Sequence, residues 1–160
     1  MEFSAGLLFY RRSQRALDLE VFLGHFGDPY WQNKDAGAWT IPKGVIEDDE
    51  DPFEAARREF EEETGIAPPS EDDAYLDLGT VQQSSSKKVT AWAVEADVDP
   101  GALESNVFEI EWPPNSGTTQ QFPELDRAAY LGLSAAAEKI VEGQRPFLDR
   151  LREAVSTAPS

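Results

Sequence analysis

The stretch GVIEDDEDPFEAARREFEEETGI, residues 44–66, contains ten acidic residues and predicts a turn followed by one helix. Asp51 is a favourable N-cap, Pro52 suits the first helical position, and Glu54 follows Asp51 by three residues, as in a capping box. Gly65 follows the last turn as a stop signal. This helix has to combine a dense set of carboxylates with a face that packs against a core.

Three glutamates of this helix are spaced to lie side by side. Glu59, Glu62 and Glu63 stand at i, i+3 and i+4, so their side chains project from neighbouring positions. The apolar stripe of the helix consists of Phe53, Ala56 and Phe60. Glu59 and Glu63 fall beside that stripe, where an uncompensated carboxylate is costly. Such a cluster is usually a solvated face, and the alternative is an oxygen-ligand site for Mg²⁺ or Mn²⁺.

The whole stretch resembles a known signature. It fits the box of the Nudix hydrolases, G-x5-E-x7-R-E-U-x-E-E-x-G-U, in which U is a bulky apolar residue. Every defined position is filled, by Gly44, Glu50, Arg58, Glu59, Phe60, Glu62, Glu63, Gly65 and Ile66. The resemblance implies an α/β fold, a Nudix-type α/β/α sandwich with a mixed central sheet, and it favours the metal site over the solvated face.

The resemblance also implies a role for each position. The three glutamates match the metal ligands of the family, and the implied cofactor is Mg²⁺ or Mn²⁺. Gly44 matches a turn whose missing side chain lets the backbone approach metal or phosphate. Glu50 and Arg58 match a pair that orients the loop against the helix, and Gly65 completes this structural part of the box.

The reaction that the resemblance implies is hydrolysis of a nucleoside diphosphate linked to another group. Some Nudix enzymes use a box glutamate as the general base, which here indicates Glu59 or Glu62. Others use a glutamate outside the box, and Glu124 resembles that residue because it lies in a predicted loop six residues before the aromatic residue of the last strand. Glu109 and Glu111 are alternatives, since alternate residues of a strand share one face.

Lys43, in the run WTIPKG, directly precedes the box and is either a phosphate contact or a solvated turn residue. The W-x-x-P-K-G pattern, the run SAGLLFYR and the basic pair Lys87 and Lys88 together resemble the diadenosine polyphosphate hydrolases of the family. We therefore expect Lys43 and Lys88 to contact substrate phosphate. The insert HFGDPYWQNKDAG, residues 25–37, does not match that branch.

Aromatic residues supply candidate base contacts. Tyr30 and Trp31 lie in a predicted loop and are expected to stack on a nucleobase, because aromatic faces bind bases with little selectivity. Trp39 lies in an apolar run, so core packing is the favoured interpretation. His25 is the only histidine, and we expect a structural role for it.

The chain as a whole predicts one domain, residues 1–155, with a short tail at 156–160. Strands are predicted at 3–12, 17–26, 38–42, 75–83, 87–98, 107–112 and 128–133. Connections are predicted at 13–16, 27–37, 67–73 and 113–125, with a turn at Lys43 and Gly44. The runs 134–140 and 145–155 are predicted to form one or two C-terminal helices.

Composition narrows the class of function. The 160 residues are 40% hydrophobic, include no Cys and carry a formal net charge of −17. Disulfides and thiolate metal sites are therefore excluded, and direct nucleic-acid binding is disfavoured because phosphate contacts need clustered Lys and Arg. The acidity fits a solvated surface or adaptation to high salt. The N-terminal apolar run is too short for a secretion signal or a membrane span, so we expect a cytoplasmic protein without membrane contact.

We therefore expect a Mg²⁺-dependent pyrophosphohydrolase acting on a nucleoside triphosphate or a dinucleoside polyphosphate such as diadenosine tetraphosphate. One alternative is a pyrophosphatase for ADP-ribose or another nucleotide sugar. Another is a non-catalytic nucleotide-sensing module, although such modules tend to lose box carboxylates that are all present here. A nucleotide polyphosphate is the expected partner, and the family resemblance leaves a homodimer open.

Overall fold

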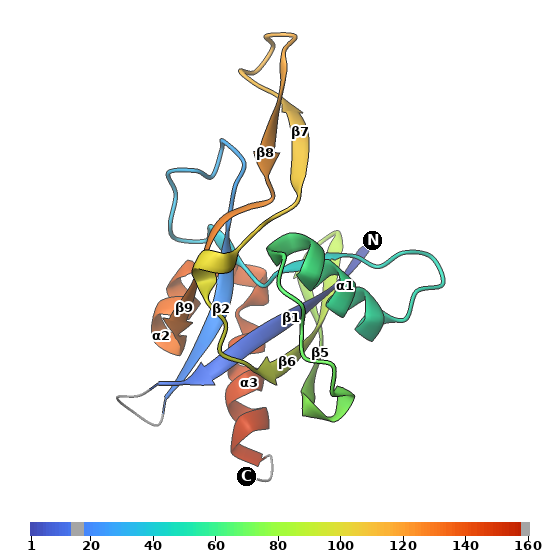
Figure 1. The fold of residues 1–160 in the computed structure, drawn as a ribbon, viewed down its shortest axis with the longest axis vertical. Helices are drawn as coiled ribbons and strands as arrows, with labels where there is room; N and C mark the ends of the chain where they lie inside the picture. The colour runs from blue at the N-terminus through green and yellow to red at the C-terminus, as the bar shows by residue number, and fades with distance from the viewer. Residues whose placement is uncertain (14–17, 158–160) are drawn as a thin grey trace.

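The sheet at the centre of the molecule is mixed. The computed structural model describes residues 1–13 and 18–157 (Figure 1). The strands of the central sheet are β1 Glu2–Arg12, β2 Leu19–Phe26, β3 Trp39–Thr40, β4 Lys43–Val45, β5 Tyr75–Ser84, β6 Lys87–Glu95 and β9 Leu125–Gly132. Their order is β3-β2-β1-β6-β5, with β4 on β1 and β9 on β2. Strands β1 and β6 are parallel, whereas the other pairs of this sheet are antiparallel.

Helices cover both faces of this sheet. They are α1 Pro52–Thr64, α2 Leu133–Lys139 and α3 Pro146–Thr157, with short 3-10 turns η1 Asp72–Ala74, η2 Pro100–Ala102 and η3 Glu142–Gln144. Successive residues of β1 point to opposite faces and so enter different cores. Phe9 belongs to the core that contains Phe60 of α1, whereas Leu8 belongs to the core that contains Phe147 of α3. The fold is the predicted α/β/α sandwich with a mixed sheet.

Helix α1 begins and ends where its sequence predicts. The Asp51 carboxylate accepts a hydrogen bond from the backbone N–H of Glu54 at 3.2 Å, which is the expected N-cap. Gly65 adopts the left-handed conformation at φ 73° and donates its N–H to the carbonyl of Glu61. The fully buried ring of Phe60 stacks on Phe9 with a centroid separation of 4.1 Å. The packing of this face fixes the directions in which the neighbouring glutamates project.

The hairpin β7–β8 corrects one prediction. Strand β7, Val107–Glu111, pairs antiparallel with β8, Thr119–Pro123, and the two form a separate sheet. Figure 1 shows this hairpin projecting away from the rest of the molecule. The predicted loop 113–125 is therefore wrong at 119–123, which form β8, and at Leu125, which begins β9, whereas Glu124 lies between the two strands. Strand β8 has the sequence TQQFP, in which apolar and polar residues do not alternate. Its formation as a strand therefore depends on pairing with β7 rather than on a pattern of its own.

Other boundaries differ by a few residues. The predicted turn at Lys43 and Gly44 is wrong, because both residues begin β4, which pairs with β1. Helix α3 continues to Thr157, beyond the start of the predicted tail at 156–160. The end of that tail, 158–160, lies outside the described residues, as do 14–17, where the predicted connection 13–16 and the first residue of the predicted strand 17–26 fall.

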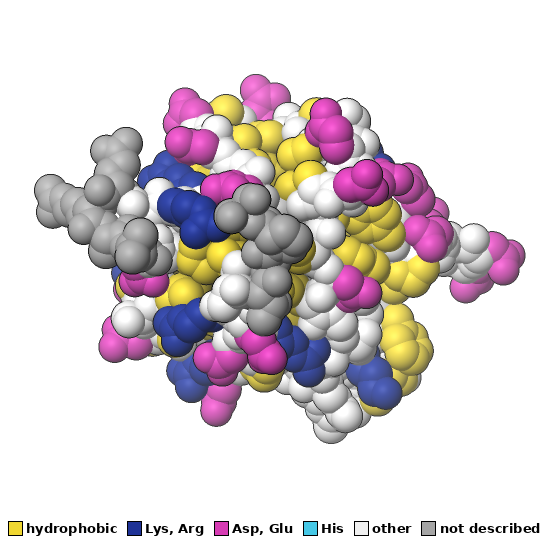
Figure 2. All heavy atoms as spheres, turned by 90° about the horizontal axis from the view of Figure 1, so that it is seen from below, with side chains coloured by type: hydrophobic (Ala, Val, Ile, Leu, Met, Phe, Trp, Pro, Cys, Tyr) yellow, Lys and Arg dark blue, Asp and Glu magenta, His cyan; other side chains and the backbone are white. Residues whose placement is uncertain are grey.

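The charged side chains are spread over the surface. Figure 2 views the molecule from below, and acidic side chains are scattered over this face and around its rim, with Lys and Arg side chains among them. Among the described residues, no buried side-chain nitrogen or oxygen lacks a hydrogen-bond partner. No helix in the described part of the chain is both long enough and apolar enough to span a bilayer.

Candidate active site

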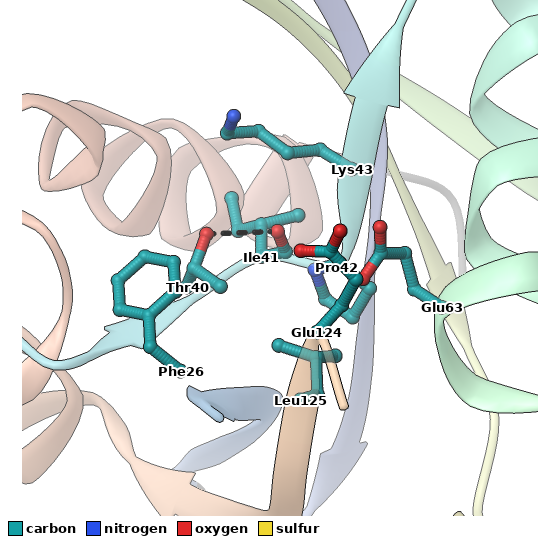
Figure 3. Close-up of a pocket in the computed structure, with 8 residues that line it drawn as sticks. All are labelled: Phe26, Thr40, Ile41, Pro42, Lys43, Glu63, Glu124 and Leu125. Carbon is teal, nitrogen blue, oxygen red and sulfur yellow. Dashed lines mark hydrogen bonds between the residues drawn. The ribbon is translucent and has the colours of Figure 1, made fainter. Parts of the chain in front are cut away.

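The candidate site lies where two strands diverge from one edge of β1. Strand β4 pairs with β1 at Ser4 to Gly6, and β2 pairs with it at Tyr10 to Arg12. Between these pairings the backbone N–H of Leu7 donates to the carbonyl of Pro42 at 3.3 Å. The cavity beside Pro42 has a volume of about 120 Å³ (Figure 3), and its lining consists of Phe26, Thr40, Ile41, Pro42, Lys43, Glu63, Glu124 and Leu125.

Two carboxylates from distant parts of the sequence meet in this cavity. Figure 3 shows the side chain of Glu63, from α1, and that of Glu124, between β8 and β9, turned toward each other. Burial, and secondarily the nearby Glu124, raises the pKa of Glu63 to about 8. Burial, and secondarily Asp28, raises the pKa of Glu124. Each carboxylate thus favours neutralisation, either by a proton or by a cation placed between the two.

Glu59 lies deeper than the other box glutamates. Its side chain is buried, with 9% of the residue exposed, and the pKa of its carboxyl is raised mainly by that burial. The carboxylate rests directly against Gly44 of β4, where any β-carbon would overlap it. Gly44 therefore needs to lack a side chain because the Glu59 carboxylate packs against it, and the predicted approach of metal or phosphate to its backbone stays a prediction.

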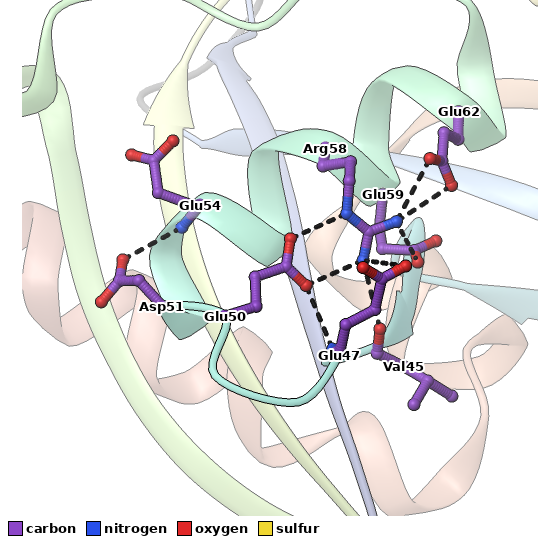
Figure 4. Close-up of polar contacts among 8 residues, drawn as sticks. All are labelled: Val45, Glu47, Glu50, Asp51, Glu54, Arg58, Glu59 and Glu62. Carbon is purple, nitrogen blue, oxygen red and sulfur yellow. Dashed lines mark hydrogen bonds and ion pairs between the residues drawn. The ribbon is translucent and has the colours of Figure 1, made fainter.

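Arg58 holds the loop before α1 to the helix (Figure 4). Its guanidinium forms two hydrogen bonds with the carboxylate of Glu50, Nε to Oε2 at 2.8 Å and Nη2 to Oε1 at 2.9 Å. This bidentate pair lowers the pKa of Glu50 to about 2. The same guanidinium donates to Glu59 at 2.9 Å and to Glu62 at 3.2 Å. Arg58 is therefore the hub of the network that positions the box carboxylates.

The carboxylates around the cavity are donors of the kind that bind a divalent metal. Carboxylate oxygens suit Mg²⁺ and Mn²⁺, and the facing carboxylates of Glu63 and Glu124 repel each other, with the charge of Lys43 offsetting only part of that repulsion. Among the described residues, however, no three His, Cys, Asp or Glu side chains converge closely enough to hold an ion. Glu59 and Glu62 point to Arg58, so these side chains must turn for all three predicted ligands to bind together. The residues fit the metal in kind, and its binding stays a prediction.

Lys43, Lys87 and Lys88 lie in strands β4 and β6 on either side of β1. Lys43 lines the cavity, and Figure 3 shows its ammonium group extended away from Glu63 and Glu124. Burial lowers the pKa of Lys43, and Lys87 lowers it further. The pairing of β1 with β4 and β6 places Lys87 on the same face as Lys43, and Lys88 on the opposite face, toward α1. The predicted phosphate contact at Lys88 stays a prediction, and the register of β6 on β1 is what distinguishes the faces of Lys87 and Lys88.

The three glutamates outside the box that are candidates for the general base lie in different parts of the structure. Glu109 and Glu111 lie on the exposed face of the projecting β7, and neither lines the cavity. Glu111 instead accepts a hydrogen bond from the backbone of Asn115 in the hairpin turn. Glu124, which the sequence predicts in a loop, is the one of these three that faces the box.

The aromatic candidates and the single histidine differ in burial, because Trp39, His25 and Trp31 pack against neighbouring residues and Tyr30 is exposed. Trp39 is buried in the core and its indole N–H donates to Asp35, so its predicted core role is confirmed. His25 is fully buried, with Nδ1 at 2.9 Å from Asp126 and Nε2 at 2.6 Å from the carbonyl of Lys34, as a structural residue would be. Trp31 packs on Phe26, whereas Tyr30 is 53% exposed.

Comparison with known proteins adds the family. A family model described as the NUDIX domain matches residues 4–151. Nudix hydrolase 25 of Arabidopsis thaliana is 63% identical over 30 residues, a match that spans 19% of this chain and 17% of that protein.

Solved structures share the fold. A C. elegans Ap4A hydrolase, crystallised as a binary complex, superposes with a TM-score of 0.63 at 21% identity, over 99% of this chain and 100% of that chain. The NUDIX domain of Shewanella oneidensis NrtR, complexed with ADP ribose, gives a TM-score of 0.62 at 14% identity, over 97% and 88% of the two chains. At these identities the likeness supports the fold alone.

Proposed function

Since this chain belongs to the Nudix family, whose domain model spans residues 4–151, we propose that it is a divalent-metal-dependent pyrophosphohydrolase acting on a nucleoside diphosphate linked to another group. We propose further that the substrate is a dinucleoside polyphosphate or a nucleoside triphosphate. The observation that carries this proposal is the meeting of Glu63 and Glu124 in one cavity, beside Lys43 and next to the Arg58 network.

The residues of the chain would divide the work among them. Glu59, Glu62 and Glu63 would hold Mg²⁺ or Mn²⁺ with the backbone of Gly44 close by, and Glu50 and Arg58 would keep the loop in register with the helix. When bound, such an ion neutralises non-bridging phosphate oxygens and favours deprotonation of the attacking water.

Glu124 is the proposed general base. Its raised pKa brings the carboxylate nearer to the range in which it can accept a proton from water. The water oxygen forms a bond to phosphorus, the bridging oxygen of the pyrophosphate leaves with the other phosphoryl group, and the proton passes to the carboxylate. Lys43 would meet the negative charge of the polyphosphate, with Lys87 on the same face of the sheet and Lys88 on the other.

A second candidate is hydrolysis of ADP-ribose or another nucleotide sugar. The box positions the reacting phosphates in either case, and the structural neighbour from Shewanella oneidensis was crystallised with ADP ribose. The groups that distinguish the two substrate classes lie outside residues 44–66. A non-catalytic sensing module is disfavoured because every box carboxylate is present.

A kinetic panel tests the proposal. Diadenosine tetraphosphate, ATP, an oxidised dGTP and ADP-ribose are each incubated with the protein and Mg²⁺, and the products are separated by chromatography. We expect turnover of at least one substrate, highest for diadenosine tetraphosphate, and its loss after treatment with EDTA. Absence of turnover with every substrate would refute the enzymatic proposal.

A matched pair of variants links the activity to the box. Glu62→Gln removes a carboxylate from the proposed ligand set, and we expect a fall in kcat of about 10³-fold. Glu61→Gln is the control, because it makes the same change at an exposed position of the same helix that the box leaves undefined. Equal kinetics for the two variants would contradict a metal role for Glu62.

A further inference from the structure

The β7–β8 hairpin and the 27–37 loop are both hydrogen-bonded, at the ends nearest the cavity, to the backbone of Glu124. The backbone N–H of Glu124 donates to the carbonyl of Asn106 at 2.9 Å, just before β7 begins. The carbonyl of Glu124 in turn accepts a hydrogen bond from Gly27 at 3.0 Å, where the loop leaves β2. The two segments are thus fixed, through one residue, to the edge of the candidate active site.

An aromatic path leads from the cavity to the hairpin. Phe26 lines the cavity, and its ring lies 5.7 Å from that of Trp31. Tyr30, which directly precedes Trp31, meets Trp112, the residue that follows β7, with ring centroids 5.1 Å apart and an interplanar angle of 85°. The four rings connect the site of proposed chemistry with the projecting part of the hairpin.

At the hairpin end of this path, the rings of Tyr30 and Trp112 have faces that are available for stacking. An edge-to-face contact occupies the edge of one ring and one face of the other, and Tyr30 is 53% exposed. No cation–π or further ring contact is recorded for Tyr30 or Trp112 among the described residues. These two side chains can therefore offer a stacking surface to a planar ligand.

The hairpin side of the path carries little negative charge, whereas the loop side contributes the carboxylate of Asp28, which accepts a hydrogen bond from the backbone N–H of Tyr30 at 2.8 Å. No charged residue occurs from Trp112 to Pro123, although the chain carries a net charge of −17. Glu109 and Glu111 alternate with Phe108, Ile110 and Trp112, so they belong to the opposite face of the hairpin. The ammonium of Lys34 lies 5.0 Å from the centroid of the Trp31 ring, which adds a positive charge midway. The aromatic face of the hairpin is consequently the side that a polyphosphate would approach.

The reach of the hairpin points to a long ligand. Trp112 lies five residues beyond Val107, which is paired with Pro123 next to Glu124. At about 3.4 Å per residue, the strand advances about 17 Å over that distance. A base held at Trp112 while phosphate is cleaved beside Glu124 requires a longer bridge than the phosphates of a mononucleotide supply.

We propose that Tyr30 and Trp112 form a subsite for the second nucleobase of a dinucleoside polyphosphate, whose phosphate chain runs past Trp31 to Lys43 and Glu124. This inference rests on the proposed function and deepens it, because it selects the substrate class. Stacking on aromatic side chains tolerates any base, so the subsite would distinguish two-base from one-base substrates rather than one base from another.

The test compares two substrates in the same variants. Tyr30→Leu and Trp112→Leu keep apolar bulk but remove the aromatic face, and we expect each to raise KM for diadenosine tetraphosphate about tenfold or more, by the usual strength of base stacking. KM for ATP and kcat for both substrates should stay unchanged. Trp112→Phe should restore most of the loss, and Val107→Ala, on the opposite face of β7, is the control with no expected effect.

Binding without turnover gives an independent measurement. Calorimetric titration with a methylene-bridged analogue of diadenosine tetraphosphate should show the same increase in Kd for Tyr30→Leu. Because Tyr30 is exposed, its replacement leaves the core intact, so this variant decides the question even if Trp112→Leu fails to fold.

The outcomes separate the two proposals. If the wild type cleaves both substrates and the variants change neither KM, or change both equally, the subsite is refuted while the proposed function stands. If the wild type cleaves no nucleotide, both are refuted. A selective rise in KM for diadenosine tetraphosphate alone supports the subsite.

Discussion

The box segment, residues 44–66, and the hairpin, residues 107–123, are built in opposite ways. The box concentrates ten acidic residues, pairs four of them with the guanidinium of Arg58 and packs its helix on the core through Phe60. The hairpin forms a sheet of its own and carries no charge from Trp112 to Pro123. The contrast indicates that the reacting groups need a rigid support, here called the frame, which is the box segment 44–66. Contact with a distal part of the substrate is supplied by a projecting segment outside it, here called the arm, which is the hairpin 107–123.

The two regions are nevertheless joined at the end of α1. The backbone N–H of Asn106 donates to the carbonyl of Glu62 at 3.2 Å, and that of Glu104 donates to the carbonyl of Thr64 at 2.8 Å. The segment before β7 thus satisfies carbonyls that the helix C-terminus leaves unpaired. A substrate held by the hairpin would be held against the same helix that carries the box carboxylates.

The largest expected effect is on kcat and concerns Glu124, which directly follows the hairpin and faces Glu63 of the box. Glu124→Gln keeps the shape of the side chain but removes the proposed base, and we expect kcat to fall by about 10²–10⁴-fold. The midpoint of thermal unfolding should not decrease, because the substitution removes a carboxylate that faces Glu63.

Glu109→Gln is the matched control for that experiment. It makes the same change on the exposed face of β7, away from the cavity, and should leave kcat unchanged. If Glu109→Gln and Glu124→Gln lose activity alike, the hairpin itself supplies the base and the division between frame and arm is wrong.

The next effect is on stability. Phe60→Ala empties a fully buried position stacked on Phe9, and we expect a loss of about 3–5 kcal/mol in the free energy of unfolding. Phe122→Ala, in the half-buried hairpin sheet, should cost less than about 1.5 kcal/mol because the ring already contacts solvent and few partners are lost. Urea denaturation measures both. Similar losses would show that the hairpin is as integral to the cooperative unit as α1.

The same division explains what the sequence could predict. Helix α1 was predictable in its type, its caps at Asp51 and Gly65, and its burial through Phe60, because each of these depends on residues a few positions apart. The burial of Glu59 beside the apolar stripe followed from helical periodicity alone. Strand β8 was not predictable in this way, because its residues carry no alternating pattern and only the pairing with β7 orders them.

Contacts between segments far apart in the chain could not be predicted from the sequence either. The facing of Glu63 and Glu124 depends on where β8 ends, and the contact of Tyr30 with Trp112 joins two segments that no motif relates. The selection between Lys87 and Lys88 required the register of β6 on β1. The turning of Glu59 and Glu62 toward Arg58, away from a shared point, likewise follows from side-chain contacts.

The smallest expected effect is on the stability of the folded protein at acidic pH, and it concerns only the Glu50–Arg58 pair of the box segment. The pKa of Glu50 is about 2 in the folded protein against 4.5 for a free glutamate, because Arg58 binds its ionised form. A lowered pKa stabilises the folded state above pH 4.5, and that stabilisation is lost as pH falls from about 4.5 to about 2. Glu50→Gln lacks this titration, so its stability deficit relative to the wild type should be largest near neutral pH and shrink as pH falls through this window.

Thermal unfolding of both proteins between pH 7 and pH 2.5 measures that difference, and the many other carboxylates cancel because the two proteins share them. Glu47→Gln is the control, since its largely exposed carboxylate lies 3.9 Å from the same guanidinium and should contribute little at any pH. A deficit for Glu50→Gln that stays constant down to pH 2.5 would mean that the ionised pair with Arg58 does not stabilise the box. The carboxylates of the helix would then owe their positions to packing on Phe9 and Gly44 alone, and the frame would differ less from the arm than the structure indicates.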